Sequence, residues 1–177
     1  MSKIILSQKI DSESQYSGDD VFKVYHYPSR YRNQIHKGDS FVYYQGNRYD
    51  KSQRYYFGCG VIGDIHCDDG ENYYAQLIGV IRFQRKVPIY LPENGYIEQL
   101  GYESVRRSIN PPWQSSVRPL SEEAYAYILN QSGTFCTAEQ CDSMLKTAIQ
   151  DYYIKKDKSA VLKIIEIAEQ LRNIYSL

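Results

Sequence analysis

Tyrosine and basic side chains are the groups in this sequence that are best placed to do chemistry. The 177-residue chain contains 19 tyrosines, and its 21 lysines and arginines equal its 21 acidic residues in number. Between positions 21 and 60 seven basic residues stand against two acidic ones, and between 81 and 119 six stand against three. Both blocks are interleaved with aromatic residues, a distribution that favours phosphates and nucleobases as ligands. Charge alone leaves an ordinary solvated surface as an equal alternative.

Catalytic and nucleotide-binding patterns are weak. His26, His36 and His66 fall in separate predicted elements, with no HxH, HExxH or paired-carboxylate arrangement around them. Residues 58–63 spell GxGxxG, but these glycines lie inside a predicted strand and open no helix, as a dinucleotide site requires. A His-Asn-His nuclease needs a histidine-bearing hairpin followed by a metal-binding helix, and the sequence predicts neither. We therefore expect no catalytic residues, no cofactor and a protein that is not an enzyme.

Cysteine spacing and hydropathy bear on metals and on cellular location. The two pairs of cysteines lack the close CxxC spacing of structural zinc sites (Cys59 and Cys67, Cys136 and Cys141). The first residues contain too short an apolar stretch for a signal peptide, which favours reduced thiols. No run of 18 apolar residues is present. We expect no metal, no membrane span and a cytoplasmic protein.

The first half of the chain has the periodicity of strands. Alternating apolar residues predict five of them, at 3–6, 21–27, 40–45, 54–65 and 72–86. Pro28 ends the second strand, Ser29 is expected to cap a short helix through Ile35, and Gly38 to close that helix. Three glycines inside the fourth strand predict bulges (Gly58, Gly60 and Gly63). Three consecutive long strands with tight connections indicate an antiparallel meander, most simply closed into a barrel.

The second half predicts a loop and then helices. Residues 91–118 have weak periodicity and should form a long ordered loop that contains Trp113. A short helix is expected to start at Ser121 and run to Asn130. A capping box at 137–140 opens a longer helix, and apolar stripes on both sides of a break at 155–158 predict a helical hairpin.

The change from strand periodicity to helical periodicity along the chain predicts two domains. We expect a barrel domain over 1–132 and a C-terminal hairpin over 133–177. The hairpin would pack on the barrel or on another chain, and a homodimer through these helices is one possibility.

Five motifs together resemble a known family. They are Tyr27-Pro28-Ser29-Arg30-Tyr31, Ile35-His36-Lys37-Gly38-Asp39, Phe41-Val42-Tyr43-Tyr44, Gly60-Val61-Ile62-Gly63-Asp64-Ile65, and Tyr73-Tyr74-Ala75 continuing to Val87-Pro88-Ile89. Over about 20–132 the chain resembles the EVE branch of the PUA-like superfamily, which is related to YTH and more distantly to SRA domains. The resemblance implies an α+β fold, with a PUA-like antiparallel β-barrel and short helices. EVE domains usually carry a tryptophan just before the positions of Tyr27 to Asn33, whereas this chain has Phe22, Tyr25 and Tyr27 there.

The resemblance also implies a function. The chain looks most like the modified-base-reading domains fused to His-Asn-His nucleases in modification-dependent restriction enzymes. Such a domain rotates a base out of the stack into an aromatic cage and reads its edge with polar groups. The implied base pocket comprises Tyr27, Tyr31, Tyr44 and Trp113 as the cage, with Arg30, Asn33 and Ser116 reading the base edge. The implied phosphate-binding residues are Arg32, Arg48, Arg54 and Arg118.

Several alternatives stay open at this stage. The partner is expected to be DNA that carries a modified base, with RNA as the alternative and a nuclease as a partner or fused domain. A third hypothesis is a protein-interaction module that uses the C-terminal helices. Trp113 could simply plug the barrel, Arg118 could pair with Glu122 or Glu123, and Asp39 is expected to cap the turn after Gly38. Because Tyr43 and Tyr44 are adjacent in a strand, only one of them should face the core.

Overall fold

The computed structural model describes residues 1–9, 22–46, 50–93, 95–102, 110–134, 138–156 and 159–176. Within the helices, the side chains of 138–143 and 170–176 lie outside this description. The chain divides into two compact units, Met1–Ser132 and Gly133–Leu177. The roles expected of them, nucleic-acid binding for the first and packing or association for the second, stay predictions.

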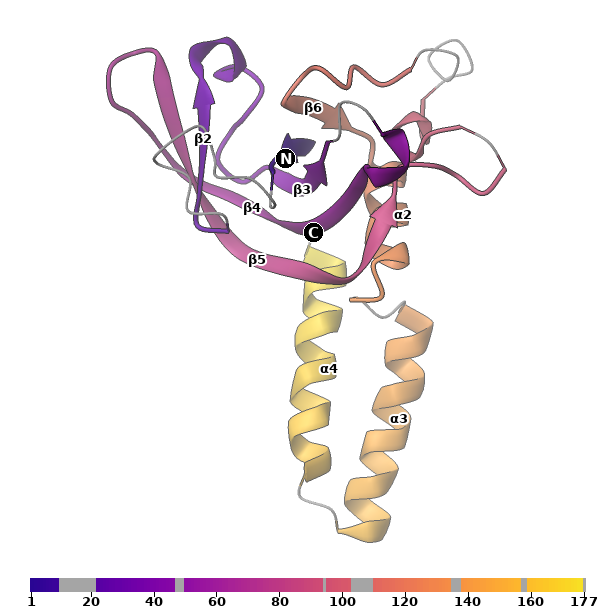
Figure 1. Cartoon of the computed structure of the whole chain (residues 1–177). Coiled ribbons are helices and arrows are strands. Elements are labelled where there is room, and N and C mark those ends of the chain that lie inside the picture. Colours follow the sequence, from indigo (N-terminus) through magenta and orange to yellow (C-terminus); the bar gives the residue numbers. More distant parts are fainter. Residues whose placement is uncertain are drawn as a thin grey trace. The chain divides into compact units, whose positions relative to one another are not determined.

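The first unit is built on one curled sheet of six strands in the order β2-β5-β4-β3-β1-β6 (Figure 1). Its strands are β1 (Lys3–Ser7), β2 (Val24–Pro28), β3 (Ser40–Gln45), β4 (Tyr55–Cys67), β5 (Asn72–Pro88) and β6 (Val117–Leu120). With the helices that follow, this confirms the predicted α+β class. The sheet is mixed because β1 and β3 run parallel, while the other neighbours are antiparallel. The parallel pair arises because the chain passes through β2, at the opposite edge, between β1 and β3.

The helices of this unit are short. They are the 3-10 turns η1 (Ser29–Tyr31), η2 (Lys51–Gln53) and η3 (Ile97–Gln99), and the helix α2 (Glu122–Gln131). The helix expected to reach Ile35 is a single 3-10 turn, because Pro28 is its N-cap and no side chain caps it. Gly38 does adopt a left-handed φ of +89°. The predicted cap of α2 is confirmed, since Ser121 Oγ accepts a hydrogen bond from the Ala124 N–H at 3.0 Å.

Glycines in β4 produce the curvature of the sheet. The register between β4 and β5 shifts at three places, between Tyr56/Gly58, Cys59/Val61 and Ile62/Ile65, and this confirms the predicted bulges. At Gly60 a Cβ would lie 2.8 Å from Cζ of Phe41 and 3.1 Å from the carbonyl oxygen of Ile78. Only a residue without a side chain allows the Phe41 ring of β3 and the Ile78 backbone of β5 to approach β4 this closely.

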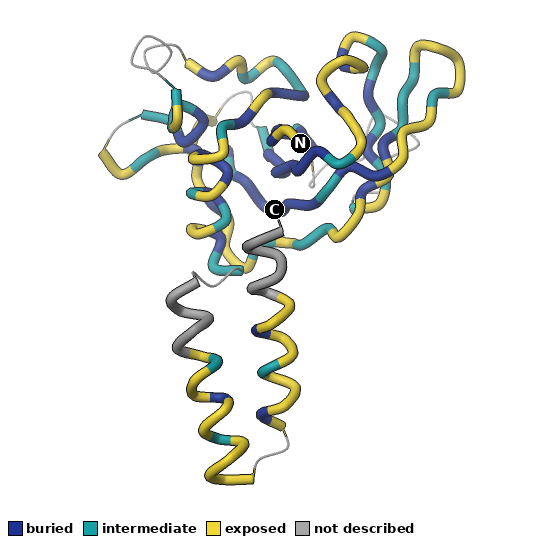
Figure 2. The backbone as a smooth tube through the Cα atoms, turned by 180° about the vertical axis from the view of Figure 1, so that it is seen from behind, coloured by how far each residue is buried: buried dark blue, intermediate teal, exposed yellow. Residues whose placement is uncertain are grey.

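Both faces of the sheet are covered. The inner face carries a tyrosine-rich core in which the rings of Tyr43 and Phe57 stack at 5.1 Å. The other face is covered by α2, whose Ala124, Tyr125 and Ile128 are buried. As expected of neighbours in a strand, only Tyr43 belongs to the inner core, although Tyr44 on the opposite face is buried as well and both are at most 2% exposed. Figure 2 shows the resulting continuous buried stretches in the strands.

Side chains link the two ends of the curled sheet. Tyr25 lies on the edge strand β2. Its hydroxyl is a donor to two carbonyl oxygens, that of Ser7 at 3.3 Å and that of Ser116 at 3.4 Å. Ser7 ends β1, and Ser116 directly precedes β6. The half-barrel is therefore tied across its seam by tyrosine-to-backbone hydrogen bonds. At the other end of β1, the Asp39 carboxylate accepts from the Ser2 and His36 N–H groups, which agrees with its predicted structural role.

The second unit is the predicted helical hairpin. It consists of α3 (Ala138–Lys155) and α4 (Ser159–Ser176), which pack through Ala148 and Ile167 with Leu145 and Ile164 alongside. The break between the helices is confirmed, and Lys156 there has a φ of +55°. The predicted capping box at 137–140 cannot be followed, because Thr137 and the side chains of 138–140 lie outside the description. In the described part of the chain, no helix is long and apolar enough to cross a membrane.

Candidate nucleic-acid interface

A small hollow lies at the seam of the curled sheet. It has a volume of about 90 Å³ and is lined by Ser7, Gln8, Tyr25, His26, Tyr27, Pro28, Arg30, Tyr31 and Ser116. These residues come from the end of β1, from β2 and η1, and from the segment that leads into β6. Segments far apart in the sequence therefore supply a wall of tyrosine rings and polar groups.

Hydrogen bonds hold the wall of the hollow in place. The Ser116 N–H donates to the Tyr31 hydroxyl at 3.0 Å, and the Arg30 guanidinium lies 4.8 Å from the centre of the Tyr31 ring. Burial works to raise the pKa of Tyr31, but hydrogen bonds with Ser116 and Ser115 and the charge of Arg30 outweigh it and lower this pKa. The Tyr31 ring is thus clamped between a backbone donor and an exposed cation.

Tyr27, one of the lining residues, carries an unsatisfied polar group. Its side chain is 1% exposed, and its ring stacks between those of Tyr25 at 6.2 Å and Tyr73 at 5.6 Å. Its buried hydroxyl has no hydrogen-bond partner among the described residues. Burial, reinforced by Tyr73 and Cys67, raises the pKa of Tyr27 to about 12, so this hydroxyl stays a proton donor at neutral pH. A buried hydroxyl without a partner costs about 1–3 kcal/mol, which an acceptor on a ligand would recover.

The structure brings together four of the seven residues predicted for the base pocket. Tyr27, Arg30, Tyr31 and Ser116 line the hollow, whereas Asn33 is exposed in the turn after η1 and is not among the lining residues. Sequence reasoning missed Ser7, Gln8, Tyr25 and His26. Tyr25 could have been found from alternation, because it shares the inner face of β2 with Tyr27.

Tyr44 and Trp113, the other two predicted cage residues, belong to a separate aromatic stack on the opposite face of the sheet. Their rings lie 5.8 Å apart at 26°, and the guanidinium carbon of Arg118 lies 4.5 Å from the centre of the Tyr44 ring. Burial raises the pKa of Tyr44. A cage that joins these two rings to Tyr27 and Tyr31 is therefore not formed, because Tyr44 points to the opposite face of the sheet. Trp113 stacks on Tyr44, and the plug of the barrel that the sequence left open for it stays a prediction.

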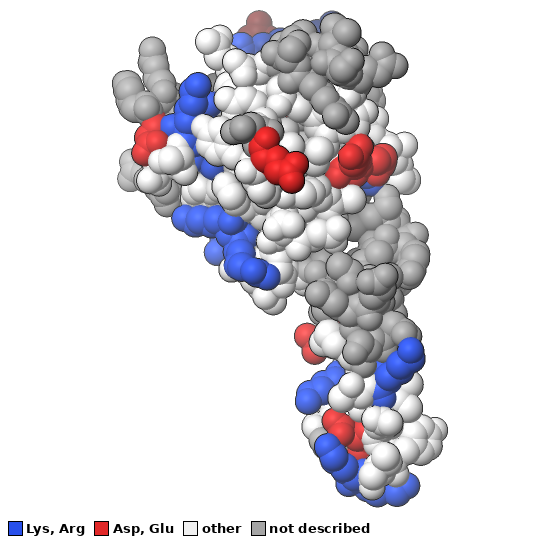
Figure 3. All heavy atoms as spheres, turned by 90° about the vertical axis from the view of Figure 1, so that its right-hand side faces the viewer, with Lys and Arg blue, Asp and Glu red and all other residues white. Residues whose placement is uncertain are grey.

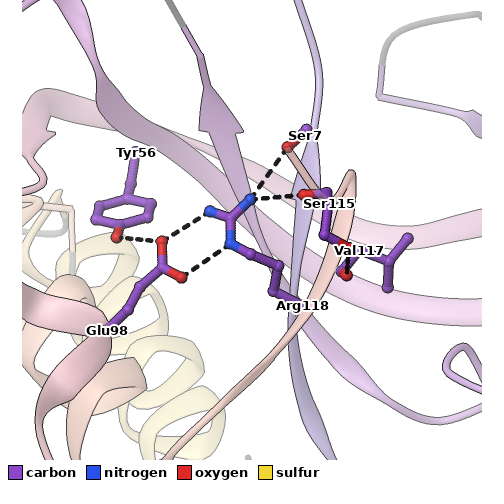
Figure 4. Close-up of polar contacts among 6 residues, drawn as sticks. All are labelled: Ser7, Tyr56, Glu98, Ser115, Val117 and Arg118. Atoms are coloured by element: carbon purple, nitrogen blue, oxygen red, sulfur yellow. Dashed lines mark hydrogen bonds and ion pairs between the residues drawn. The ribbon is translucent and has the colours of Figure 1, made fainter. Parts of the chain in front are cut away.

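Arg118 forms a buried ion pair (Figure 4). Its Nε and Nη2 donate to the two carboxylate oxygens of Glu98 at 2.9 and 2.7 Å, and the Tyr56 hydroxyl donates to Oε1 of the same carboxylate at 3.0 Å. Burial works to lower the pKa of Arg118, but its hydrogen bonds and ion pair with Glu98 raise it. The predicted phosphate-binding role is corrected here, because this guanidinium is 1% exposed and fully engaged. Its partner is Glu98, not Glu122 or Glu123.

The same arginine positions one wall of the hollow. Its Nη1 donates to the Ser115 carbonyl oxygen at 2.9 Å and to the Ser7 hydroxyl at 3.4 Å. Ser7 lines the hollow, and Ser115 precedes Ser116, which also lines it. Arg118 is therefore a positioning residue that couples the buried ion pair to the shape of the hollow.

The other predicted phosphate-binding arginines are dispersed. Arg54 is 9% exposed and lies 5.3 Å from the centre of the Trp113 ring, so it too is poorly placed for phosphate. Arg48 lies outside the described residues. Arg32 is exposed two residues after Arg30 and is not among the residues that line the hollow. Of the four, Arg32 alone has an exposed side chain in the described part of the chain.

Metal ligands do not gather in the described residues, where no group of three or more His, Cys, Asp or Glu side chains could hold an ion. Cys59 is buried, and this burial raises the pKa of its thiol to about 12. Cys67 is half-buried with a free thiol, and Cys136 and the Cys141 side chain lie outside the description.

Comparisons with known proteins find structural similarity that is weak. No protein-family model matches the chain, and no curated protein matches it either. Among solved structures the chain is similar to the human THYN1 protein in complex with DNA that contains 5-methylcytosine. The two share 12% sequence identity with a TM-score of 0.44, over 77% of this chain and 100% of that one. A similarity at this level assigns no family.

Proposed function

We propose that this chain is a non-catalytic reader of a modified base in DNA, which it takes into the hollow after the base has left the stack. The observation that carries the proposal is a hollow walled by tyrosine side chains, one of which, Tyr27, has a buried hydroxyl without a hydrogen-bond partner among the described residues. An extruded base offers what this site lacks, namely an acceptor on its edge and a flat face for the rings. Tyr27 would donate to the base edge, and Gln8 and Ser116 would contact its other polar groups.

Energetics set the requirements for such binding. Stacking on an aromatic ring is worth about 1–3 kcal/mol per base, which is similar to the few kcal/mol needed to extrude it. Phosphate contacts must therefore supply the remaining affinity. The hollow is smaller than the cavity of about 150 Å³ that holds benzene, so it encloses the substituted edge of a base and not a whole nucleotide. Movement of the exposed Arg30 side chain at the rim would enlarge it.

The biological context is also part of the proposal. We place the chain in the cytoplasm as the specificity module of a restriction or defence system whose nuclease lies on another domain or chain. The sequence motifs and the net charge of zero favour DNA over RNA. RNA binding is the competing outcome of the test below.

A binding panel tests this function. Fluorescence anisotropy is measured with duplexes that differ in one base: unmodified, methylated, hydroxymethylated or glucosylated cytosine, or methylated adenine, together with matched RNA. We expect one modified duplex to bind at least tenfold more tightly than its unmodified twin, because the substituent fills the hollow. Trp113→Ala should keep this preference, since Trp113 does not line the hollow. If all duplexes bound equally and binding depended steeply on salt, the chain would bind DNA only through nonspecific electrostatic contacts, and the proposal would be wrong.

A second role is favoured by the hairpin unit. Among the described residues, its exposed large apolar side chains are Met144, Ile149, Tyr152, Tyr153, Ile154, Val161, Leu162 and Ile165. Figure 2 shows how few residues of these helices are buried. Two helices with so small a mutual core gain little from packing on each other alone. We propose a second copy of the chain as the partner, because two hairpins can bury these side chains as a four-helix bundle.

The oligomeric state tests this second role. We expect light scattering after size-exclusion chromatography to give the mass of a dimer for the wild type. Ile154→Glu or Leu162→Glu should give a monomer, because each places a charge where an apolar side chain would be buried. Gln150→Glu, at an exposed polar position of α3, should remain dimeric. A monomeric wild type would contradict the bundle, and so would a dimer that persists in the Ile154→Glu and Leu162→Glu variants.

A further inference from the structure

A row of polar side chains follows the inner face of β5, away from the hollow. Arg82, Gln84 and Lys86 alternate along the strand and are all exposed. The Arg82 guanidinium carbon lies 4.0 Å from the centre of the Phe22 ring, and Lys86 Nζ lies 4.2 Å from the centre of the Tyr55 ring. Both rings pack against the inner core, so this row belongs to the same concave face as the tyrosines of the hollow. We call Phe22, Tyr55, Arg82 and Lys86 the β5 ledge.

The two cations of the β5 ledge are available to an anion. Neither Arg82 nor Lys86 has a carboxylate within ion-pairing distance among the described residues, whereas Lys37 pairs with Asp64 at 2.6 Å. An aromatic ring beneath a cation orients it without neutralising its charge. Figure 3 shows a group of Lys and Arg side chains at the lower edge of the larger unit with no acidic side chain beside it.

The aromatic floor of the β5 ledge is rigid. Phe22 has a left-handed φ of +83°, which is rare for a bulky residue and costs about 1–3 kcal/mol. Its ring makes edge-to-face contacts with Tyr43 at 5.6 Å and Phe57 at 6.3 Å, and these hold it in place. With these contacts on its edges, the Phe22 ring keeps one face under the Arg82 guanidinium. The outer face of that guanidinium is a plane on which a base or sugar can also stack.

We propose that the β5 ledge binds the sugar-phosphate backbone of the nucleic-acid strand whose base enters the hollow. This inference rests on the proposed function. The β5 ledge would supply the phosphate contacts that Arg54 and Arg118 are too buried to make.

The spacing along β5 gives the reach of this contact. Gln76 pairs with Val24, next to Tyr25 of the hollow, and Arg82 lies six residues further along β5. At about 3.3 Å per residue this separation is at most about 20 Å, because β5 is curled and its pairing with β4 is bulged, which is at most about six steps of 3.4 Å along a duplex strand. The ledge therefore contacts phosphates in the flank of the modified base and not at the base itself.

The salt dependence of DNA binding tests the β5 ledge. For the Arg82→Ala/Lys86→Ala double variant we expect weaker binding to every duplex, with the ratio of modified to unmodified affinity unchanged. The slope of log K against log salt should fall in magnitude by about 2, because two phosphate contacts are lost. Lys86→Ala alone should lower the slope by about 1. Lys37→Ala is the matched control, since this exposed lysine already has a carboxylate partner, and it should leave the slope unchanged.

A flank series provides the second measurement. Shortening the duplex to fewer than about six base pairs on both sides of the modified base should weaken wild-type binding and leave the double variant unaffected. Unchanged affinity and slope in the double variant would overturn the β5 ledge while leaving the reading of a modified base intact. A changed modified-to-unmodified ratio would likewise overturn it. Absence of any wild-type binding would overturn the proposed function and the ledge together.

Discussion

Glu98→Gln is expected to lower the free energy of unfolding by about 3–5 kcal/mol, the usual effect of removing one partner of a buried ion pair. The variant leaves the Arg118 guanidinium charged at a site that is 1% exposed. It also replaces an acceptor of three hydrogen bonds, two from Arg118 and one from Tyr56. Urea unfolding followed by tryptophan fluorescence measures the change, because Trp113 lies 5.5 Å from the Arg118 guanidinium carbon.

Matched variants separate the ion pair from general effects. Glu93→Gln, at an exposed position of the same loop, should change the stability by less than about 0.5 kcal/mol. The double variant Glu98→Leu/Arg118→Met should recover most of the loss, since replacing a buried pair by apolar residues is often neutral or stabilising. A Glu98→Gln protein as stable as the wild type would show that Arg118 is not held as a buried charge.

Tyr27→Phe is expected to weaken binding of the preferred modified duplex about tenfold, which corresponds to about 1.4 kcal/mol, while the folded state keeps or gains stability. The two effects have one cause. The hydroxyl has no partner among the described residues, so its removal relieves a buried unsatisfied group, whereas in the complex it would donate to the base. Anisotropy titrations and urea unfolding of the same preparation measure both quantities.

Tyr125→Phe is the control for this prediction. Tyr125 is also a buried tyrosine, but it lies on α2 and does not line the hollow. Removal of the Tyr125 hydroxyl should leave the affinity for every duplex unchanged. A Tyr27→Phe protein that is less stable than the wild type but binds the modified duplex equally well would contradict this prediction. The Tyr27 hydroxyl would then have a structural partner and would not read the base.

Local patterns in the sequence were sufficient for most elements. The alternation in β3 and β5, the serine cap of α2 and the lysine-rich break after Lys155 each depend on residues close in sequence. The bulges at the glycines of β4 also followed from spacing, because a missing side chain is itself the local signal. The exceptions include the helix after Pro28, where only one 3-10 turn forms, and β6, which begins in a segment expected to be a loop.

The site depended on pairings between distant segments. The sequence alone indicated that tyrosines and arginines would matter, and it identified Tyr27, Arg30, Tyr31 and Ser116, which the fold brings to one hollow. Only the tertiary structure decided that β1 pairs with β3 in parallel, that Tyr44 faces away from Tyr27, and that Arg118 meets Glu98. The physical reason is that periodicity specifies which side chains share a face of one strand. Which faces and which buried charges meet is decided by how the sheet curls, and that is a property of the whole first unit.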